Sequence, residues 1–467
     1  MTLPVVPLVV ATALFMETMD SSLLSTALPA IARDLGVDPI ALKLAITSYL
    51  VSLAIFIPVS GWLADRLGAR TTFRAALAIF IAASVGCATA STLEGFVAWR
   101  FLQGVGGALM VPVGRLVLIR AVPKGELVQA LSYLTIPSLL GPLTGPPLAG
   151  FLATYADWRW IFLVNVPVAA LGIVLASIYF TDDKPAPHPL DVKGLALTSI
   201  ALPGLVLGAA LVGRHVAAPS VAFVIFSTGA IAAWLYARHA RRVERPLLDL
   251  KLFALDTFDA GVVGGMLFRM GIGASAFLVP LMLQIGFGLD PLTSGLITFT
   301  GAFGALTMKT LAPRILRRLG FRRVLVWNGL LASAALATTA LFTPSTPHVV
   351  MSAVLLVGGF VRSLQFSSLN AIAYADVPAE RTSAATSLAS VAQQVSLSFG
   401  VALAAVALEA FATLGGRATP GPQDFSATLL LIAAVSSLAA PRMVALRDDA
   451  GRLLSHGVRN DRTSGRQ

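Results

Sequence analysis

Charged residues are scarce in this chain of 467 residues, since only 12% of them are Asp, Glu, Lys or Arg. A soluble domain carries about 25%, so the chain has too few charges to cover a water-facing surface. Hydrophobic residues instead make up 56% of the sequence, and the mean hydropathy is +0.82. The composition therefore indicates a polytopic membrane protein.

The alternating ten-residue pattern of a membrane-spanning barrel is missing as well. Long apolar runs recur along the whole sequence, and in lipid only helices and closed barrels satisfy every backbone hydrogen bond. We therefore expect an all-α integral membrane protein. The first apolar run follows no Lys- or Arg-bearing leader, so it should remain as the first spanning helix.

Cysteine is almost absent: Cys87 lies alone inside an apolar run, so no internal disulfide can form. The five histidines fall in or beside loops and lack the spacing of metal ligands. A phosphate-binding Gly-x-x-x-x-Gly-Lys-Ser/Thr loop is also missing. We therefore expect no enzyme, no metal site and no cofactor, and transport driven by ion gradients or by the substrate's own gradient.

The charged stretch Gly61–Arg74 lies between two apolar runs of about 20 residues, each long enough to span a membrane, so it should lie at a membrane face. An imperfect copy follows at Ala312–Leu325, and such internal repeats are typical of secondary transporters. Gly68 and Gly320 are 252 residues apart, whereas a six-helix half needs roughly 200. The surplus fits two extra helices between two related halves.

The apolar runs predict about fourteen spanning helices, and the loops between them divide the chain into four segments. These are a six-helix bundle (1–181), a two-helix insertion with a basic cytoplasmic loop (182–252), a second six-helix bundle (253–441) and a cytoplasmic tail (442–467). Arg and Lys concentrate in the loops that follow even-numbered helices, so the positive-inside rule places both termini in the cytoplasm. This topology, rather than a nucleic-acid partner, explains the net charge of +11.

Two acids lie in the first spanning helix, Glu17 and Asp20, spaced so that they share one helix face. An ionisable group inside a membrane is costly, which makes it a functional candidate. If a proton and a cationic substrate compete for one such carboxylate, antiport follows. The other interpretation is an acid hydrogen-bonded near a helix end.

Arg100 and Gln103 stand beside a glycine cluster in the fourth predicted helix. Arg100 should face a central cavity and bias the protonation of the acids, although a purely structural ion pair is the alternative. The fifth helix carries a Gly/Pro motif that predicts a kinked, closely packed seam for rocking motions, or else a merely bent packing helix. Its members are Gly141, Pro142, Gly145, Pro146 and Gly150.

Polar residues also interrupt apolar runs of the second half, and some of them must line the substrate cavity. The candidates there, with Gln103 from the first half, are Arg269, Gln284, Arg362, Gln365 and Asn370.

At these motifs the sequence resembles the major facilitator superfamily. Gly61–Arg70 is similar to the hallmark loop between helices 2 and 3, Arg100–Gly107 to the helix 4 motif, and Gly141–Pro146 to the antiporter motif of helix 5. Met19–Pro29 and Trp158–Pro167 resemble the fourteen-helix drug:proton antiporter branch. Met110–Arg115 and Leu283–Gly286 resemble the corresponding segments of enterobacterial-type multidrug transporters.

The resemblance implies roles for matching residues. Asp20 and Arg100 would form the proton-coupling pair, with Glu17 as a further candidate. Asp65 would stabilise the outward-open form by binding the positive helix N-terminus near Arg381–Ser383. The gate and conformational switch would comprise Gly61, Asp65, Arg66, Gly68 and Arg70. The loop departs from the family pattern at Ala69–Thr71, where two adjacent basic residues are usual.

These features favour a facilitator of the bacterial inner membrane that exports amphipathic compounds in exchange for protons, with small molecules, protons and lipid as its partners and a monomer as its default state. One alternative is a dedicated carrier of one metabolite, such as an organic anion held by Arg100, Arg269 and Arg362. Another is a membrane sensor without transport.

Overall fold

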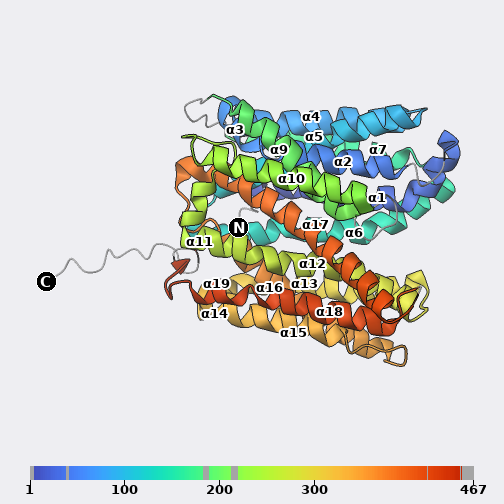
Figure 1. The fold of residues 1–467 in the computed structure, drawn as a ribbon. Coiled ribbons are helices and arrows are strands. Elements are labelled where there is room, and N and C mark those ends of the chain that lie inside the picture. Colours follow the sequence, from blue (N-terminus) through green and yellow to red (C-terminus); the bar gives the residue numbers. More distant parts are fainter. Residues whose placement is uncertain are drawn as a thin grey trace. The chain divides into compact units, whose positions relative to one another are not determined.

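The computed structural model describes residues 5–37, 42–181, 189–211, 219–417, 419–452 and 454, and every regular element in these ranges is a helix (Figure 1). The predicted all-α class is confirmed. The polar break that ends the first predicted bundle falls largely at residues 182–188, and most of the predicted tail falls at 455–467. Both segments lie outside the described residues.

Nine helical stretches of the described chain are long and apolar enough to cross a membrane, and a tenth span consists of α2 (Lys43–Phe56) and α3 (Ser60–Leu67), bent by 58°. The nine are α4 (Ala69–Thr89), α5 (Leu93–Ala121), α7 with α8 (Trp160–Leu163, Asn165–Tyr179), α9 (Val192–Leu211), α10 (Pro219–Ala240), α11 through η4 (Asp256–Gly286), α16 (His348–Ile372), η6 with α17 (Ala379–Arg381, Thr382–Leu414) and α18 with α19 (Pro422–Ser437, Ala440–Val444).

Four further helical stretches complete a set of about fourteen, in agreement with the sequence. They are α1 (Val5–Leu35), α6 (Leu127–Tyr155), α13 (Pro291–Leu319) and the run α14, η5 and α15 (Phe321–Arg323, Val324–Asn328, Gly329–Thr339). The short helices η1 (Lys124–Glu126) and η2 (Leu250–Ala254) lie in loops.

The chain divides into two compact units. The first comprises Met1–Leu118, Tyr133–Leu250 and Ala379–Ala402, and the second comprises Ile119–Ser132, Lys251–Pro378 and Leu403–Gln467. The pair α9 and α10 therefore belongs to the first unit, where α9 packs against α2 as well as α10. Gly204 and Gly229 let α9 and α10 approach closely, since a Cβ on Gly204 would lie 2.7 Å from the Gly229 Cα.

Aromatic packing closes one end of the first unit. Phe96 from α5 meets Trp158 and Phe162 edge-on, with ring centroids 6.1 and 5.6 Å apart, which is a favourable geometry for aromatic rings. Just outside α7, Arg159 hydrogen-bonds to Asp34 at 2.8 Å. Desolvation by partial burial lowers the pKa of the Arg159 guanidinium, but the hydrogen bonds and charges of Asp34 and Asp157 together outweigh it and raise the pKa. The contact ties the end of α1 to the start of α7.

In the second unit, α13 and α16 pack so closely that no side chain fits between them at Gly359. A Cβ there would overlap the carbonyl oxygen of Gly301, and one at Gly304 would overlap that of Leu356. Small residues allow such contact because they place no bulk between the two backbones. In lipid there is no hydrophobic driving force between helices, so this close packing stabilises their association.

The two copies of the charged stretch adopt the same backbone geometry. Gly68 separates α3 from α4 with φ of 91°, and Gly320 separates α13 from α14 with φ of 77°. A positive φ strongly favours glycine, so each glycine ends one helix and lets the next begin at once. The repeat seen in the sequence is therefore a repeat in structure.

Candidate functional site

Asp20 is the centre of a buried polar network in the first unit. Its carboxylate, 1% exposed, accepts hydrogen bonds from Arg100 Nη1 at 2.7 Å, Gln103 Nε2 at 2.9 Å and Asn165 Nδ2 at 3.0 Å. Gln103 also contacts Ser84 Oγ at 3.0 Å. Residues of α5 and α8 thus converge on one carboxylate of α1, Ser84 of α4 contacts Gln103 beside it, and the carboxylate charge is matched by one arginine.

Aromatic rings complete the surroundings of Arg100. Its guanidinium carbon lies 4.6 Å from the ring centroid of Tyr49 and 5.9 Å from that of Phe162, distances at which a ring face attracts a cation. Gly104 makes this possible, because a Cβ there would lie 2.7 Å from the Tyr49 carbonyl oxygen. Without a side chain at Gly104, α5 can press against α2 beside the network.

Glu17 lies about one turn before Asp20 on α1 and is half-buried. Its charged neighbours are Asp20 and Arg115, a buried arginine of α5. Among the described residues, Arg115 Nε has no hydrogen-bond partner. A second acid and a second arginine thus accompany the first pair.

Asp65 and Gly61 of α3 contact the beginning of α17, within the same unit. Ser383 Oγ donates a hydrogen bond to Asp65, which is 7% exposed, and Gly61 N donates to Ser387 Oγ at 3.0 Å. A Cβ on Gly61 would lie 2.7 Å from the Ser383 carbonyl oxygen. The carboxylate therefore lies at the positive N-terminal end of α17, where helix dipoles favour negative charge.

The basic residues of this stretch lie differently. Arg66 is exposed, with its guanidinium carbon 5.4 Å from the Trp62 ring centroid, while Arg70 is half-buried and its Nε has no hydrogen-bond partner in the described chain. The structure therefore brings Gly61 and Asp65 to the α17 contact, with Arg66 on the surface.

The Gly/Pro motif lies within α6, which is helical throughout. Gly141 faces α1 so closely that a Cβ would lie 2.7 Å from the Met19 nitrogen, and Gly145 is also buried. The side chains of Pro142 and Pro146, and the surroundings of Gly150, lie outside what the structure describes. The motif thus packs beside the Asp20 helix.

Arg269 and Asn370 meet in the second unit. Arg269 donates to Asn370 Oδ1 at 3.1 Å and to the carbonyl oxygens of Gly261 and Val262 at 3.2 and 3.4 Å. Those carbonyls belong to the π-helical segment η3 (Ala260–Gly264), whose irregular backbone leaves acceptors for a side chain. Arg269 therefore satisfies backbone acceptors of the π-helical segment within the span Asp256–Gly286.

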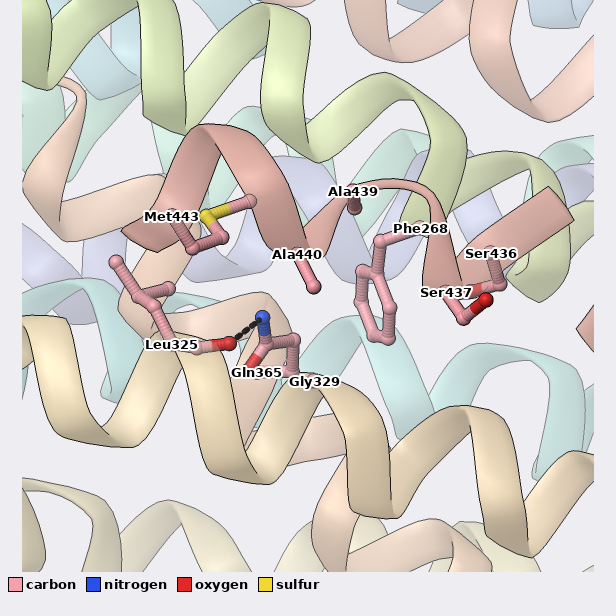
Figure 2. Close-up of a pocket in the computed structure, with 9 residues that line it drawn as sticks. All are labelled: Phe268, Leu325, Gly329, Gln365, Ser436, Ser437, Ala439, Ala440 and Met443. Carbon is pink, nitrogen blue, oxygen red and sulfur yellow. Dashed lines mark hydrogen bonds between the residues drawn. The ribbon is translucent and has the colours of Figure 1, made fainter. Parts of the chain in front are cut away.

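Gln365 hydrogen-bonds to a second π-helical segment, η5 (Val324–Asn328). Its Nε2 donates to the Leu325 carbonyl oxygen at 3.0 Å, and its Oε1 accepts from Asn328 at 3.2 Å. Figure 2 shows this amide at the wall of a small pocket between Phe268 and Met443. The pocket has room for about one water molecule, so it is too small for a drug-sized ligand.

Gln284 and Arg362 complete the predicted cavity residues. Gln284 is exposed in the π-helical segment η4 (Met282–Gly286), 3.4 Å from Ser294 Oγ. Arg362 is half-buried and donates to Ser275 Oγ at 3.3 Å. Arg269 and Asn370 thus contact each other, whereas Gln284, Arg362 and Gln365 donate hydrogen bonds to other residues of their unit.

Sequence reasoning missed Asn165, Ser84 and Lys309. Asn165 stood inside the Trp158–Pro167 motif without a role, and Ser84 carries no sequence signal. Lys309 is a buried lysine of α13 whose Nζ donates to Ser367 Oγ at 2.8 Å. Its signal was plain, because a single lysine in an apolar helix is a functional candidate. No group of three potential metal ligands occurs in the described ranges.

The chain belongs to the Major Facilitator Superfamily, whose family model matches residues 10–401 and 262–452. It is a multi-pass membrane protein of a family of small-molecule transporters. The predicted family is thereby confirmed.

Among its relatives are proteins named as multidrug resistance protein MdtD. The one from Pectobacterium carotovorum is 38% identical over 405 residues, with 86% of each chain covered. The one from Klebsiella pneumoniae is 37% identical over 448 residues, covering 95% of this chain and 94% of the relative. The predicted similarity to enterobacterial multidrug transporters is confirmed.

Two solved structures share the fold. The human organic anion transporter MFSD10 superposes with a TM-score of 0.67 at 16% identity, covering 95% of this chain and all of that one. The proton:xylose symporter XylE gives a TM-score of 0.67 at 15% identity, with 96% of each chain covered. At such low identity the likeness concerns the fold alone.

Proposed function

We propose that the protein is a proton-coupled antiporter that exports amphipathic, drug-like compounds across the bacterial inner membrane by alternating access. The observation that carries the proposal is the Asp20 carboxylate, buried in a spanning helix and paired with Arg100. A buried ion pair adds little to stability and is weak evidence for a structural role. The MdtD relatives, named for multidrug resistance, support the substrate class.

The geometry suggests how a proton on Asp20 is felt by the protein. With Asp20 ionised, the pair is neutral overall. With Asp20 protonated, the charge of Arg100 loses its counter-ion, but Gln103 Oε1 lies 2.5 Å from its Nη1 and the Tyr49 ring lies beside it. Protonation therefore shifts Arg100 between partners on α1, α2 and α5, which is a rearrangement of helix contacts.

A cationic substrate favours the opposite state of the pair. Its positive charge stabilises an ionised carboxylate and disfavours a protonated one. Binding of substrate and binding of a proton therefore exclude each other at Asp20. Exchange of one for the other on opposite sides of the membrane is antiport.

The contact of Asp65 with the start of α17 is proposed as the switch that stabilises the outward-open form. A carboxylate hydrogen-bonded at a helix N-terminus gains from both the hydroxyl donor and the helix dipole. We place both termini of the chain in the cytoplasm and propose a monomer as the transporting unit, because one facilitator chain suffices to form a path.

A carrier of organic anions is the second candidate. In the first unit Arg100 is already neutralised by Asp20, which argues against it. In the second unit Lys309 and Arg362 have hydroxyl partners and no ion pair with an acid among the described residues, which favours it. A substrate carboxylate could compensate those charges.

The test measures proton release from the purified, detergent-solubilised full-length protein. Lipophilic cations such as tetraphenylphosphonium and ethidium, and organic anions such as benzoate, are added in turn to wild type and to Asp20→Asn. Asp34→Asn is the matched control, because Asp34 lies on the same helix but is exposed and pairs with Arg159.

Cations should release protons from wild type and from Asp34→Asn but not from Asp20→Asn. If only anions bind, and Asp20→Asn binds them as wild type does, the antiport role of Asp20 fails and the anion carrier becomes the better assignment. A ligand-dependent conformational change without flux in proteoliposomes would instead indicate a sensor.

A further inference from the structure

The second unit contains a buried lysine that no step of the proposed antiport uses. Lys309, 5% exposed, lies in the spanning helix α13 and donates to Ser367 Oγ at 2.8 Å. Its Nζ lies 5.6 Å from the ring centroid of Phe366. One hydroxyl and one ring face are its described partners, and Ser367 is itself buried.

The charged groups near Lys309 on the packed elements are cations. On α16, Arg362 lies one turn before Phe366 and binds Ser275. On α12 (Gly265–Leu281), the guanidinium carbon of Arg269 is 5.9 Å from the same Phe366 ring. The segment η4 brings no charged side chain, and the next one along α13 is Arg314. In the described part of the chain no carboxylate forms an ion pair with Lys309.

Such a site favours a neutral side chain. Burying an ammonium ion without a counter-ion carries a desolvation penalty larger than one hydrogen bond offsets. An arginine cannot lose its proton in a protein, but a lysine can. Lys309 is therefore the member of this group of cations that can remove its charge.

The hydroxyl of Ser367 suits both forms of Lys309. It accepts a hydrogen bond from the ammonium, and by rotating it donates one to the lone pair of the neutral amine. Loss of a proton therefore leaves no unsatisfied polar atom behind. An aspartate or glutamate partner would instead hold Lys309 permanently charged.

We propose that Lys309 is a second proton-carrying group, which cycles between ammonium and amine during transport. The proposal rests on the proton-coupled antiport argued above and adds a proton site in the second unit to the one at Asp20. When a cationic substrate binds, the ammonium gives one proton to water and becomes the amine. When the substrate has left, water returns the proton.

The test is direct observation of the lysine by NMR. The full-length protein is labelled with ¹³C,¹⁵N-lysine, and the Cε–Nζ resonances are followed in detergent from pH 5 to pH 11. The chain has only six lysines, so the other five serve as internal references. Lys309→Arg identifies the signal by its loss, and Ser367→Ala identifies it by its shift if the first variant does not fold.

As the pH rises, we expect the Lys309 resonance to change from ammonium to amine before the other lysine resonances do. Adding tetraphenylphosphonium near the Lys309 midpoint should increase the amine fraction. A resonance that stays in the ammonium form beyond pH 9.5 overturns the proposal. A shift toward ammonium on adding benzoate also overturns it, because Lys309 would then be binding anions.

Transport assays separate this proposal from the antiport itself. In proteoliposomes Lys309→Arg keeps a positive charge that cannot be released, so export should fall at least tenfold while the Asp20-dependent proton release persists. Lys193→Arg, on the exposed part of α9, is the matched control. Unchanged export by Lys309→Arg refutes the role of Lys309 and leaves the antiport standing, whereas the absence of Asp20-dependent proton release in wild type refutes the antiport itself.

Discussion

At the scale of single residues, the Asp20 network is almost completely buried, unlike an ion pair at the protein surface. Asp20, Arg100, Gln103 and Asn165 are each at most 1% exposed. Neither charge can turn to water if its partner is lost, because each would remain in a low-dielectric interior. Each charge in the pair therefore depends on the other, which makes their coupling measurable.

A double-mutant cycle on this pair should show strong coupling. Arg100→Gln should destabilise the protein by about 3–5 kcal/mol at neutral pH, because it leaves a buried carboxylate uncompensated. Adding Asp20→Asn should recover most of that loss, because both charges are then gone. The measurement is the free energy of unfolding in detergent for wild type, both single variants and the double variant.

The cycle separates a coupled pair from two independent contributions. If the two losses simply add in the double variant, Asp20 and Arg100 do not act as a pair.

At the scale of helices, glycines determine where the spans can touch. Gly359 has α13 directly against it, whereas a Cβ added to Gly295 on α13 would have no neighbouring atom within 4 Å. The sequence shows both only as glycines in apolar runs. Their opposite surroundings could not have been predicted from it.

Alanine at these two glycines should therefore have opposite effects. Gly359→Ala should cost about 1–3 kcal/mol, because overpacking pushes α16 away from α13. Gly295→Ala should be neutral or stabilise by up to about 1 kcal/mol, because alanine is the better helix former. Thermal unfolding in detergent measures both, and equal losses would show that the α13–α16 approach is not the cause.

The contact between α3 and α17 should respond to one carboxylate. Spin labels at Arg74 of α4 and Glu380 of η6, both exposed, report this distance in a Cys87→Ser background. Asp65→Asn should shift the distance distribution to longer values, because the amide loses the charge that the α17 terminus favours. The exposed Glu94→Gln is the control, and identical distributions in all three proteins would contradict the switch.

Sequence patterns predicted the spans well and their interruptions poorly. The apolar runs indicated about fourteen helices, and the two copies of the charged stretch, with Gly68 and Gly320, indicated two related halves. Both signals are local in the sequence. The bend between α2 and α3 and the π-helical turns η3, η4 and η5 depend on which helix packs alongside. Arg269 and Gln365 are the cavity candidates whose side chains donate hydrogen bonds to carbonyl oxygens of η3 and η5.

The Asp20 site divides in the same way. Asp20, Arg100 and Gln103 could be singled out because charged or amide groups in apolar helices are costly. Asn165 and Ser84 could not, because their part in the network comes from helices far apart in sequence. Lys309 is the remaining case, because a lysine within an apolar run is already a functional candidate in the sequence.

At the scale of the whole molecule, the distribution of arginine predicts which loops face the cytoplasm. The loop after α10 carries Arg241, Arg242 and Arg245, while the loop from Thr343 to Thr346 between α15 and α16 carries no charge. Basic loops are retained inside the cell during insertion. The two loops should therefore lie on opposite faces of the membrane.

Cysteine labelling of intact cells tests this orientation with few changes, because Cys87→Ser alone removes every native thiol. A membrane-impermeant maleimide should label Ser345→Cys in cells whose outer membrane has been permeabilised, because that loop faces outward. It should label Arg242→Cys only after the inner membrane is opened. Both positions are exposed, so poor access cannot explain a difference between them. The reverse pattern would place the termini outside, and Asp65 would then lie at the periplasmic end of α3, which removes the argument for a cytoplasmic gate.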